Sequence, residues 1–116
     1  MYKVLIILFL ASQFIVEAQG QVLVSGAGNE SCGKWIETRN EPAQHYQYLR
    51  WIEGFISGVN WQHHGQQAHP PDVAAIVAFT DQYCKNNPLH LIVYAAAVLV
   101  QETGGPKVDP RHQWKR

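Results

Sequence analysis

Charged residues are scarce in this chain, and neither sign of charge dominates. They make up 16% of the 116 residues, and nine basic side chains balance nine acidic ones. This balance disfavours nucleic acid as a partner, because binding to a phosphate backbone depends on a basic surface. The apolar share of 47% is typical of one compact globular domain and excludes a disordered or fibrous chain.

The chain also lacks an apolar run long enough to span a bilayer, which takes about 20 residues. The run that follows Lys3 is shorter, and Val16 and Ala18 suit the minus-three and minus-one positions of a cleavage site. Residues 1–18 are therefore predicted to be a signal peptide that is removed after Ala18. We expect a periplasmic or secreted protein with no stable membrane insertion after cleavage.

Cysteine is limited to Cys32 and Cys84. In an exported chain, this even count predicts one disulfide between them. Closing a loop of some fifty residues stabilises a fold by about 4 kcal/mol in the chain-entropy model. The alternative is that Cys84 is a nucleophile paired with a histidine, and this role requires a free thiolate.

Motifs of catalysis are missing as well. There is no glycine-rich phosphate loop, nucleophile elbow or HExxH pattern. Four carboxylates, Glu37, Glu53, Asp81 and Glu102, are scattered along the chain, and no pattern pairs any two of them for acid-base chemistry. We therefore predict no enzyme activity and no cofactor, with a small hydrolase or metal-binding protein as the alternative from another class.

Three apolar patterns with helical periodicity are present and predict an all-α fold. They cover residues 40–61, 72–85 and 89–100, and a short helical turn is expected around Trp35. The last of the three is apolar on nearly all sides, so we expect it to be the most buried element. The predicted architecture is a small three-to-four-helix bundle stapled by the disulfide.

Residues that start and stop helices set the expected boundaries. Asn40 and Asp72 can each cap a helix, while Asn87 and Pro88 can start the last one. We expect a helical domain at residues 32–103. A flexible leader at residues 19–31 and a basic mobile tail at residues 104–116 are expected to flank it.

Glycine recurs at Gly54 and Gly58, four residues apart on the first long helix. Such a pair allows another backbone to approach closely, although each glycine costs about 1 kcal/mol of helix propensity. The pair predicts a tight helix crossing, either within the chain or in a homodimer.

Histidine and tryptophan are frequent for this length. His63, His64 and His69 lie in one polar stretch, where they could sense pH or bind a metal ion, or simply face solvent. Trp51 and Trp61 lie on the first long helix and are candidates for core packing or for aromatic anchors in a protein interface.

Several stretches resemble a pattern found in small exported bacterial proteins. They are WIEGFISGVN at residues 51–60, DQYCKNNP at residues 81–88 and the end of the apolar helix, LVQE, at residues 99–102. The pattern is similar to that of the HdeA-like acid-stress chaperones and of the Rap1a/Tai immunity proteins, and it covers residues 32–102. Immunity proteins of this type often carry additional cysteines, which this chain lacks.

The resemblance implies a disulfide-bonded, all-helical periplasmic domain with no catalytic residues. Its partner would be an unfolded client protein for a chaperone, or an effector enzyme for an immunity protein. We therefore expect a non-catalytic protein-binding module, with an acid-stress chaperone as the leading interpretation.

Overall fold

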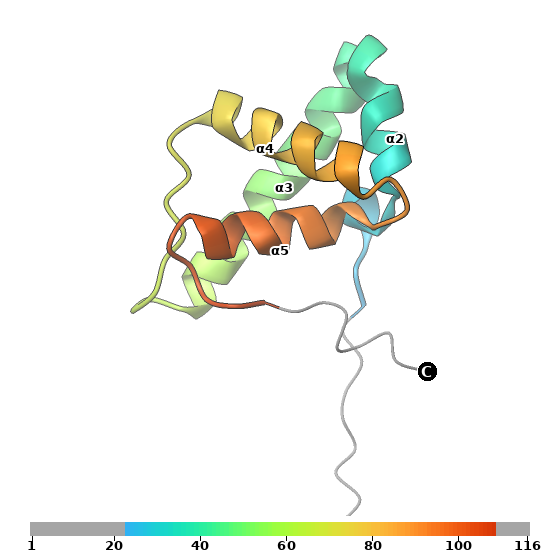
Figure 1. The fold of residues 1–116 in the computed structure, drawn as a ribbon. Coiled ribbons are helices and arrows are strands. Elements are labelled where there is room, and N and C mark those ends of the chain that lie inside the picture. Colours follow the sequence, from blue (N-terminus) through green and yellow to red (C-terminus); the bar gives the residue numbers. More distant parts are fainter. Residues whose placement is uncertain (1–22, 109–116) are drawn as a thin grey trace, which may run out of the picture.

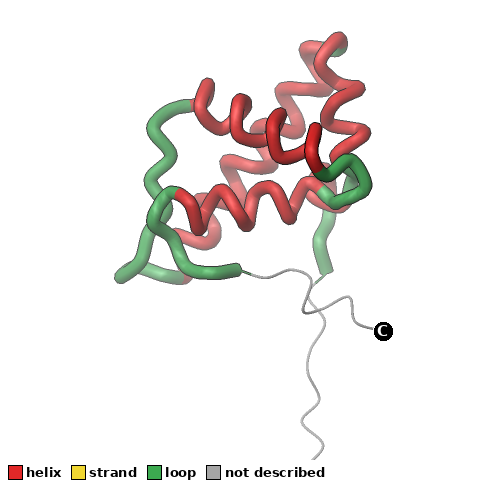
Figure 2. Tube along the Cα trace, in the orientation of Figure 1, coloured by secondary structure: helices red, strands yellow, loops and turns green. Residues whose placement is uncertain are grey.

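The computed structural model describes residues 23–108, and all regular elements in this part of the chain are helical (Figures 1 and 2). This confirms the predicted all-α bundle. In chain order the elements are η1 (Gly26–Asn29), α2 (Cys32–Glu37), η2 (Thr38–Asn40), α3 (Pro42–Gln62), α4 (Val73–Asn86) and α5 (Ile92–Glu102). The predicted signal peptide and its cleavage site lie outside the described residues.

Helix α3 is the longest element and forms one wall of the core. It begins at Pro42, whose fixed backbone angle suits the first helical position. Glu41 takes the N-cap position where Asn40 was expected, because Asn40 ends the preceding 3-10 turn. The core face of α3 consists of four buried residues, Tyr48, Leu49, Ile52 and Ile56.

Helix α4 starts where its sequence predicts. The Asp72 side chain accepts a hydrogen bond of 2.8 Å from the Ala75 backbone N–H, which is the expected N-cap geometry. Ile76, Thr80 and Cys84 are buried on the face that meets the core.

Helix α5 is the most buried element, as predicted, but it begins at Ile92 instead of Leu89. The carbonyls of Pro88 and His90 accept hydrogen bonds from Gly33 N–H and Cys32 N–H at the start of α2. These two hydrogen bonds satisfy backbone N–H groups that have no partner within α2. They also keep the turn between α4 and α5 from adopting helical geometry. Leu89, at the tip of that turn, is 92% exposed.

The predicted disulfide between Cys32 and Cys84 is confirmed. Both residues are fully buried, and the bond ties the short helix α2 to α4. Neither cysteine is free, so the alternative of a Cys84 nucleophile is wrong. A structural disulfide of this kind is typical of oxidising compartments outside the cytoplasm.

Both segments that flank the bundle are more ordered than expected where the structure describes them. In the predicted flexible leader, residues 26–29 form η1, and Gly28 is buried against α3. In the predicted mobile tail, Gly105 and Pro106 are buried, and Gly105 N–H donates to the Val100 carbonyl at 2.8 Å. Residues 19–22 and 109–116 lie outside the described part.

Candidate functional site

Trp51, one of the two candidate anchors, packs within the monomer. Its indole Nε1–H donates to the Ser25 carbonyl at 2.8 Å, and its ring stacks on Phe55 with 5.5 Å between centroids. A Cβ on Gly28 would come within 2.1 Å of the ring. The N-terminal segment thus covers Trp51, which favours the core-packing alternative for this residue.

Gly54 and Gly58 do not make the predicted crossing with another helix of the described chain. A Cβ built on either glycine would meet no neighbouring heavy atom within 4 Å. Both lie on the exposed side of α3, opposite the core residues Ile52 and Ile56. The helix pattern itself carried this information, because Gly54 and Gly58 share a face with the polar Arg50 and not with the apolar stripe.

Trp61, one turn beyond Gly58 on the same face of α3, is a large aromatic side chain that the described bundle leaves uncovered. It is 82% exposed, and its nearest aromatic contact is an edge-on arrangement with His64, at 6.5 Å between centroids. A tryptophan this exposed is a candidate anchor for a partner protein, since aromatic anchors dominate many interfaces.

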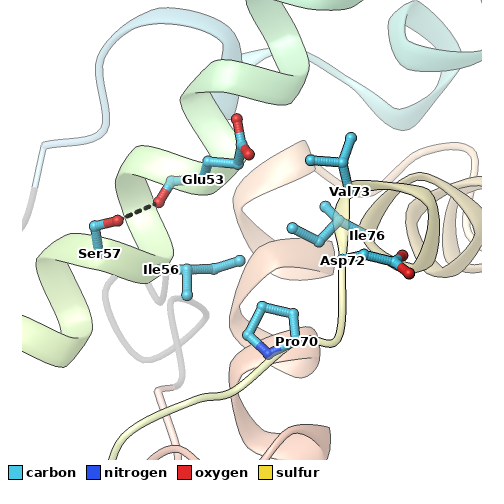
Figure 3. A pocket seen from close by; sticks show the side chains of 7 residues that line it. All are labelled: Glu53, Ile56, Ser57, Pro70, Asp72, Val73 and Ile76. Atoms are coloured by element: carbon cyan, nitrogen blue, oxygen red, sulfur yellow. Dashed lines mark hydrogen bonds between the residues drawn. The ribbon is translucent and has the colours of Figure 1, made fainter.

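Two hollows of the surface share Ser57, and Trp61 lines one of them. The first, of about 260 Å³, separates α3 from the start of α4; we call it the α3–α4 groove. Its lining residues are Glu53, Ile56, Ser57, Pro70, Asp72, Val73 and Ile76. In Figure 3 the side chains of Ile56, Pro70 and Ile76 face one another across it, and the Asp72 carboxylate points away. The second, of about 540 Å³, is the Trp61 hollow, lined by Ser57, Asn60, Trp61, His64 and Gln67.

The loop between α3 and α4 is pinned to the bundle, which fixes one wall of both hollows. The Asn60 side chain donates to the Ala68 carbonyl at 2.9 Å and accepts from the Ala68 N–H at 2.8 Å. The His69 N–H donates to the Thr103 carbonyl at 2.9 Å, and Ala68 is buried. The hollows are therefore preformed features of the surface.

The three candidate histidines of this region do not converge. His63 caps the end of α3, His64 faces Trp61, and His69 is tied through its backbone to residue 103. Within residues 23–108, no three His, Cys, Asp or Glu side chains form a group that could hold a metal ion. All three histidines are exposed, so a role in pH sensing stays a prediction.

A second polar cluster, missed by sequence reasoning, joins α2, η2, α3 and α4; we call it the Trp35 cluster. The fully buried Trp35 donates from Nε1 to the Asp81 carboxylate at 2.8 Å, and Arg39 forms an ion pair with the same carboxylate. The His45 ring tilts against Trp35 at 4.4 Å between centroids, and its Nδ1 lies 3.1 Å from Thr38 Oγ1. Since the Thr38 hydroxyl donates to the Trp35 carbonyl, its oxygen can accept from Nδ1–H of neutral His45.

The disulfide was the signal that could have revealed this cluster. Trp35 lies three residues after Cys32, and Asp81 lies three residues before Cys84, so each shares a helix face with its cysteine. Joining the cysteines therefore brings Trp35 and Asp81 together.

Acid would disturb the Trp35 cluster through His45. Burial lowers the pKa of His45, and the nearby positive charge of Arg39 lowers it further. The neutral ring is therefore favoured in the folded protein, and protonation would place a second cation beside Arg39.

The fold and these surfaces define a small, disulfide-bonded, all-α domain with a preformed, partly apolar face around Trp61. No protein-family model, curated protein or solved structure matches this chain. No helix in the described part of the chain is long and apolar enough to cross a membrane.

Proposed function

We propose that this protein is a non-catalytic, periplasmic protein-binding module whose binding surface surrounds Trp61. The observation that carries the proposal is the 82% exposure of this tryptophan in the wall of a preformed hollow. Aromatic anchors next to apolar pockets are the usual centres of protein interfaces. The disulfide supports an exported protein, and the resemblance of residues 32–102 to the HdeA-like chaperones and the Rap1a/Tai immunity proteins supports a periplasmic location.

The leading version of this proposal is an acid-responsive chaperone that holds unfolded client proteins. Two features support it. The chain carries six histidines, the residue type that most often gains positive charge in mild acid. In addition, the Trp35 cluster holds one of them, His45, in a setting that disfavours protonation. Acidification would therefore loosen packing between helices that the disulfide still keeps together.

Client protection at low pH tests the chaperone version. The oxidised mature chain is mixed with lactate dehydrogenase at pH 3, and light scattering follows aggregation during neutralisation. We expect the wild type to suppress scattering and the Trp61→Ala variant to lose most of this effect. Leu89→Ala is the matched control, because Leu89 is also highly exposed but lies in the α4–α5 turn. Equal activity of the two variants would contradict a binding surface centred on Trp61.

The second version is an immunity-type inhibitor of a folded effector enzyme. The pinned loop favours it, because a rigid, preformed surface suits a folded partner. The product of a gene next to that of this chain is the enzyme to test, and its activity at pH 7 would fall on addition of the wild type but not of Trp61→Ala. Inhibition at pH 7 without client protection at pH 3 would select this version over the chaperone.

A homodimer through the bare surface at Gly54 and Gly58 stays a further proposal. Sedimentation velocity of the oxidised mature chain over a range of concentrations tests it directly. A constant monomer mass would exclude it.

A further inference from the structure

The Trp61 hollow combines a flat aromatic surface with neutral hydrogen-bonding groups. Its lining residues are Ser57, Asn60, Trp61, His64 and Gln67, and none of them is an acidic residue, a lysine or an arginine. A phosphorylated or strongly charged ligand would therefore find no opposite charge in this lining. The volume of about 540 Å³ lies within the range of about 300–1,000 Å³ that is common for small-molecule sites.

The indole ring of Trp61 is open to a ligand. The residue is 82% exposed, and the planes of the indole and the His64 ring meet at 81°, so the histidine does not lie flat on the indole. The faces of an aromatic ring carry partial negative charge. They attract C–H groups whose carbon atoms are bonded to oxygen, because such groups carry partial positive charge.

The amide side chains of the hollow keep part of their hydrogen-bonding capacity. A side-chain amide has two N–H donors and a carbonyl oxygen that can accept two hydrogen bonds. Asn60 uses one donor and one acceptor position on the Ala68 backbone, and within the described chain the others are left for a ligand. Gln67 donates from Nε2 to the His64 carbonyl at 3.4 Å, and no residue between 23 and 108 donates to its Oε1. The hollow therefore offers donors and acceptors beside the indole.

These groups are held in place before any ligand binds. Asn60 and Trp61 lie on α3, and the two hydrogen bonds to the buried Ala68 fix the Asn60 amide. The loop that carries Gln67 is held a second time, because the Gln66 side chain donates to the Gly105 carbonyl at 3.3 Å. A preformed site of this kind loses less conformational entropy when a ligand binds.

A neutral sugar ring matches both parts of this surface. A pyranose with equatorial hydroxyl groups presents axial C–H groups on its faces and hydroxyl groups around its rim. One face would stack on Trp61, and the rim would exchange hydrogen bonds with Asn60 and Gln67. A purely apolar ligand would instead cover these amides without giving them partners, which costs free energy.

We propose that the Trp61 hollow is a binding site for a neutral sugar ring of a glycan, with the ring stacked on the indole and its hydroxyl groups bonded to the amides of Asn60 and Gln67. This inference goes beyond the proposed protein-binding function, because it assigns to the hollow a ligand that is not a protein. Binding of the sugar requires no protein partner.

Two neutral trisaccharides, cellotriose and chitotriose, test the assignment. Each is titrated into the isotope-labelled, oxidised mature chain, and NMR follows the indole N–H of Trp61 and the side-chain amides of Asn60 and Gln67. Sorbitol offers hydroxyl groups without a ring, and acetyl-leucinamide offers an apolar side chain without hydroxyl groups. We expect a trisaccharide to shift these signals to saturation, and the two small probes to leave them unchanged at the same concentration. Because no ion pair forms, the affinity should stay the same when salt is added.

Variants separate stacking from hydrogen bonding. Trp61→Ala should weaken trisaccharide binding at least about fivefold, whereas Trp61→Phe should keep part of the affinity because a smaller aromatic ring still stacks. Gln67→Ala should weaken binding about two- to tenfold, as expected for the loss of one neutral hydrogen bond. Gln47→Ala is the matched control, because Gln47 is exposed on α3 but lies outside the hollow, and it should leave the affinity unchanged. All three side chains are exposed, so the variants should fold, which the dispersion of their NMR spectra checks.

Several results would overturn the proposal. These are the absence of shifts with both trisaccharides, equal shifts with sorbitol or acetyl-leucinamide, unchanged affinity in Trp61→Ala, or an equal loss of affinity in the Gln47→Ala control. Failure of the trisaccharides alongside Trp61-dependent client protection or enzyme inhibition would refute this site and leave the proposed function standing. Trisaccharide binding by a chain that neither protects clients nor inhibits an enzyme would support the site and refute the proposed function.

Discussion

Replacing Gly54 and Gly58 by alanine should stabilise the protein. Both glycines lie in the interior of α3, where glycine costs roughly 0.5–1 kcal/mol relative to alanine because it loses more backbone freedom on folding. A Cβ at either position meets nothing within 4 Å, so no steric cost opposes this gain. The double variant should therefore gain about 1–2 kcal/mol in the free energy of unfolding.

Thermal and urea unfolding of the oxidised mature chain, followed by circular dichroism at neutral pH, measure this gain. In a domain of this size, 1 kcal/mol corresponds to roughly 4–8 °C in Tm, so the double variant should melt about 4–16 °C higher than the wild type. The two single variants should add, because neither alanine displaces a neighbour. Destabilisation by either substitution would show that the glycines are packed against something, and it would refute the exposed placement of this face.

Three other predictions follow from the packing and from the titration of one histidine. Gly28→Ala should lower the free energy of unfolding in urea by about 1–3 kcal/mol, because its Cβ would come within 2.1 Å of the Trp51 ring. A variant as stable as the wild type would contradict the close packing of η1. Reduction of the disulfide between Cys32 and Cys84, which are 52 residues apart, should lower the free energy of unfolding by about 4 kcal/mol in the same assay. A loss below about 1 kcal/mol would contradict its role as the main covalent stabiliser of the fold. Because the pKa of His45 is lowered in the folded state, the unfolded chain binds protons first, so wild-type stability should fall as the pH drops below about 6.5 and level off below the folded pKa. Urea unfolding of His45→Gln should show a shallower fall over that window, and parallel curves would rule out this histidine as a source of acid sensitivity.

The sequence predicted those helix boundaries that depend on local chemistry. Asp72 caps α4 and Pro42 lies at the start of α3, and both effects involve neighbouring residues in the chain. The predicted start of α5 is wrong by three residues. The reason is that the carbonyls of Pro88 and His90 accept hydrogen bonds from backbone N–H groups at the start of α2, more than fifty residues away in sequence. A helix boundary that depends on such a distant partner cannot be predicted from the residues next to it in the chain.

The candidate site was predicted in part. Trp61 was singled out together with Trp51, although only Trp51 lies beside the apolar stripe of α3 and Trp61 shares the face of Gly58. What separates them is the segment at residues 25–28, which covers Trp51 and has no counterpart over Trp61 among residues 23–108. The groove was not predicted at all, since it depends on how the pinned loop directs α4 past α3.

The bare surface of α3 at Gly54 and Gly58 is compatible with the proposed protein-binding function. Two glycines together lower the stability of the helix by about 1–2 kcal/mol, and within residues 23–108 no backbone or side chain uses the space they leave. On the same face, Trp61 leaves most of its apolar surface in contact with water. Burial of that surface would stabilise the protein. Both features weaken the isolated monomer. Under the proposed function, a partner chain along α3 would make both favourable, because the glycines would allow close approach and Trp61 would be buried. A face that serves only as a solvated surface gains from neither feature, so alanine at Gly54 and Gly58 should raise stability while any larger residue there reduces partner binding.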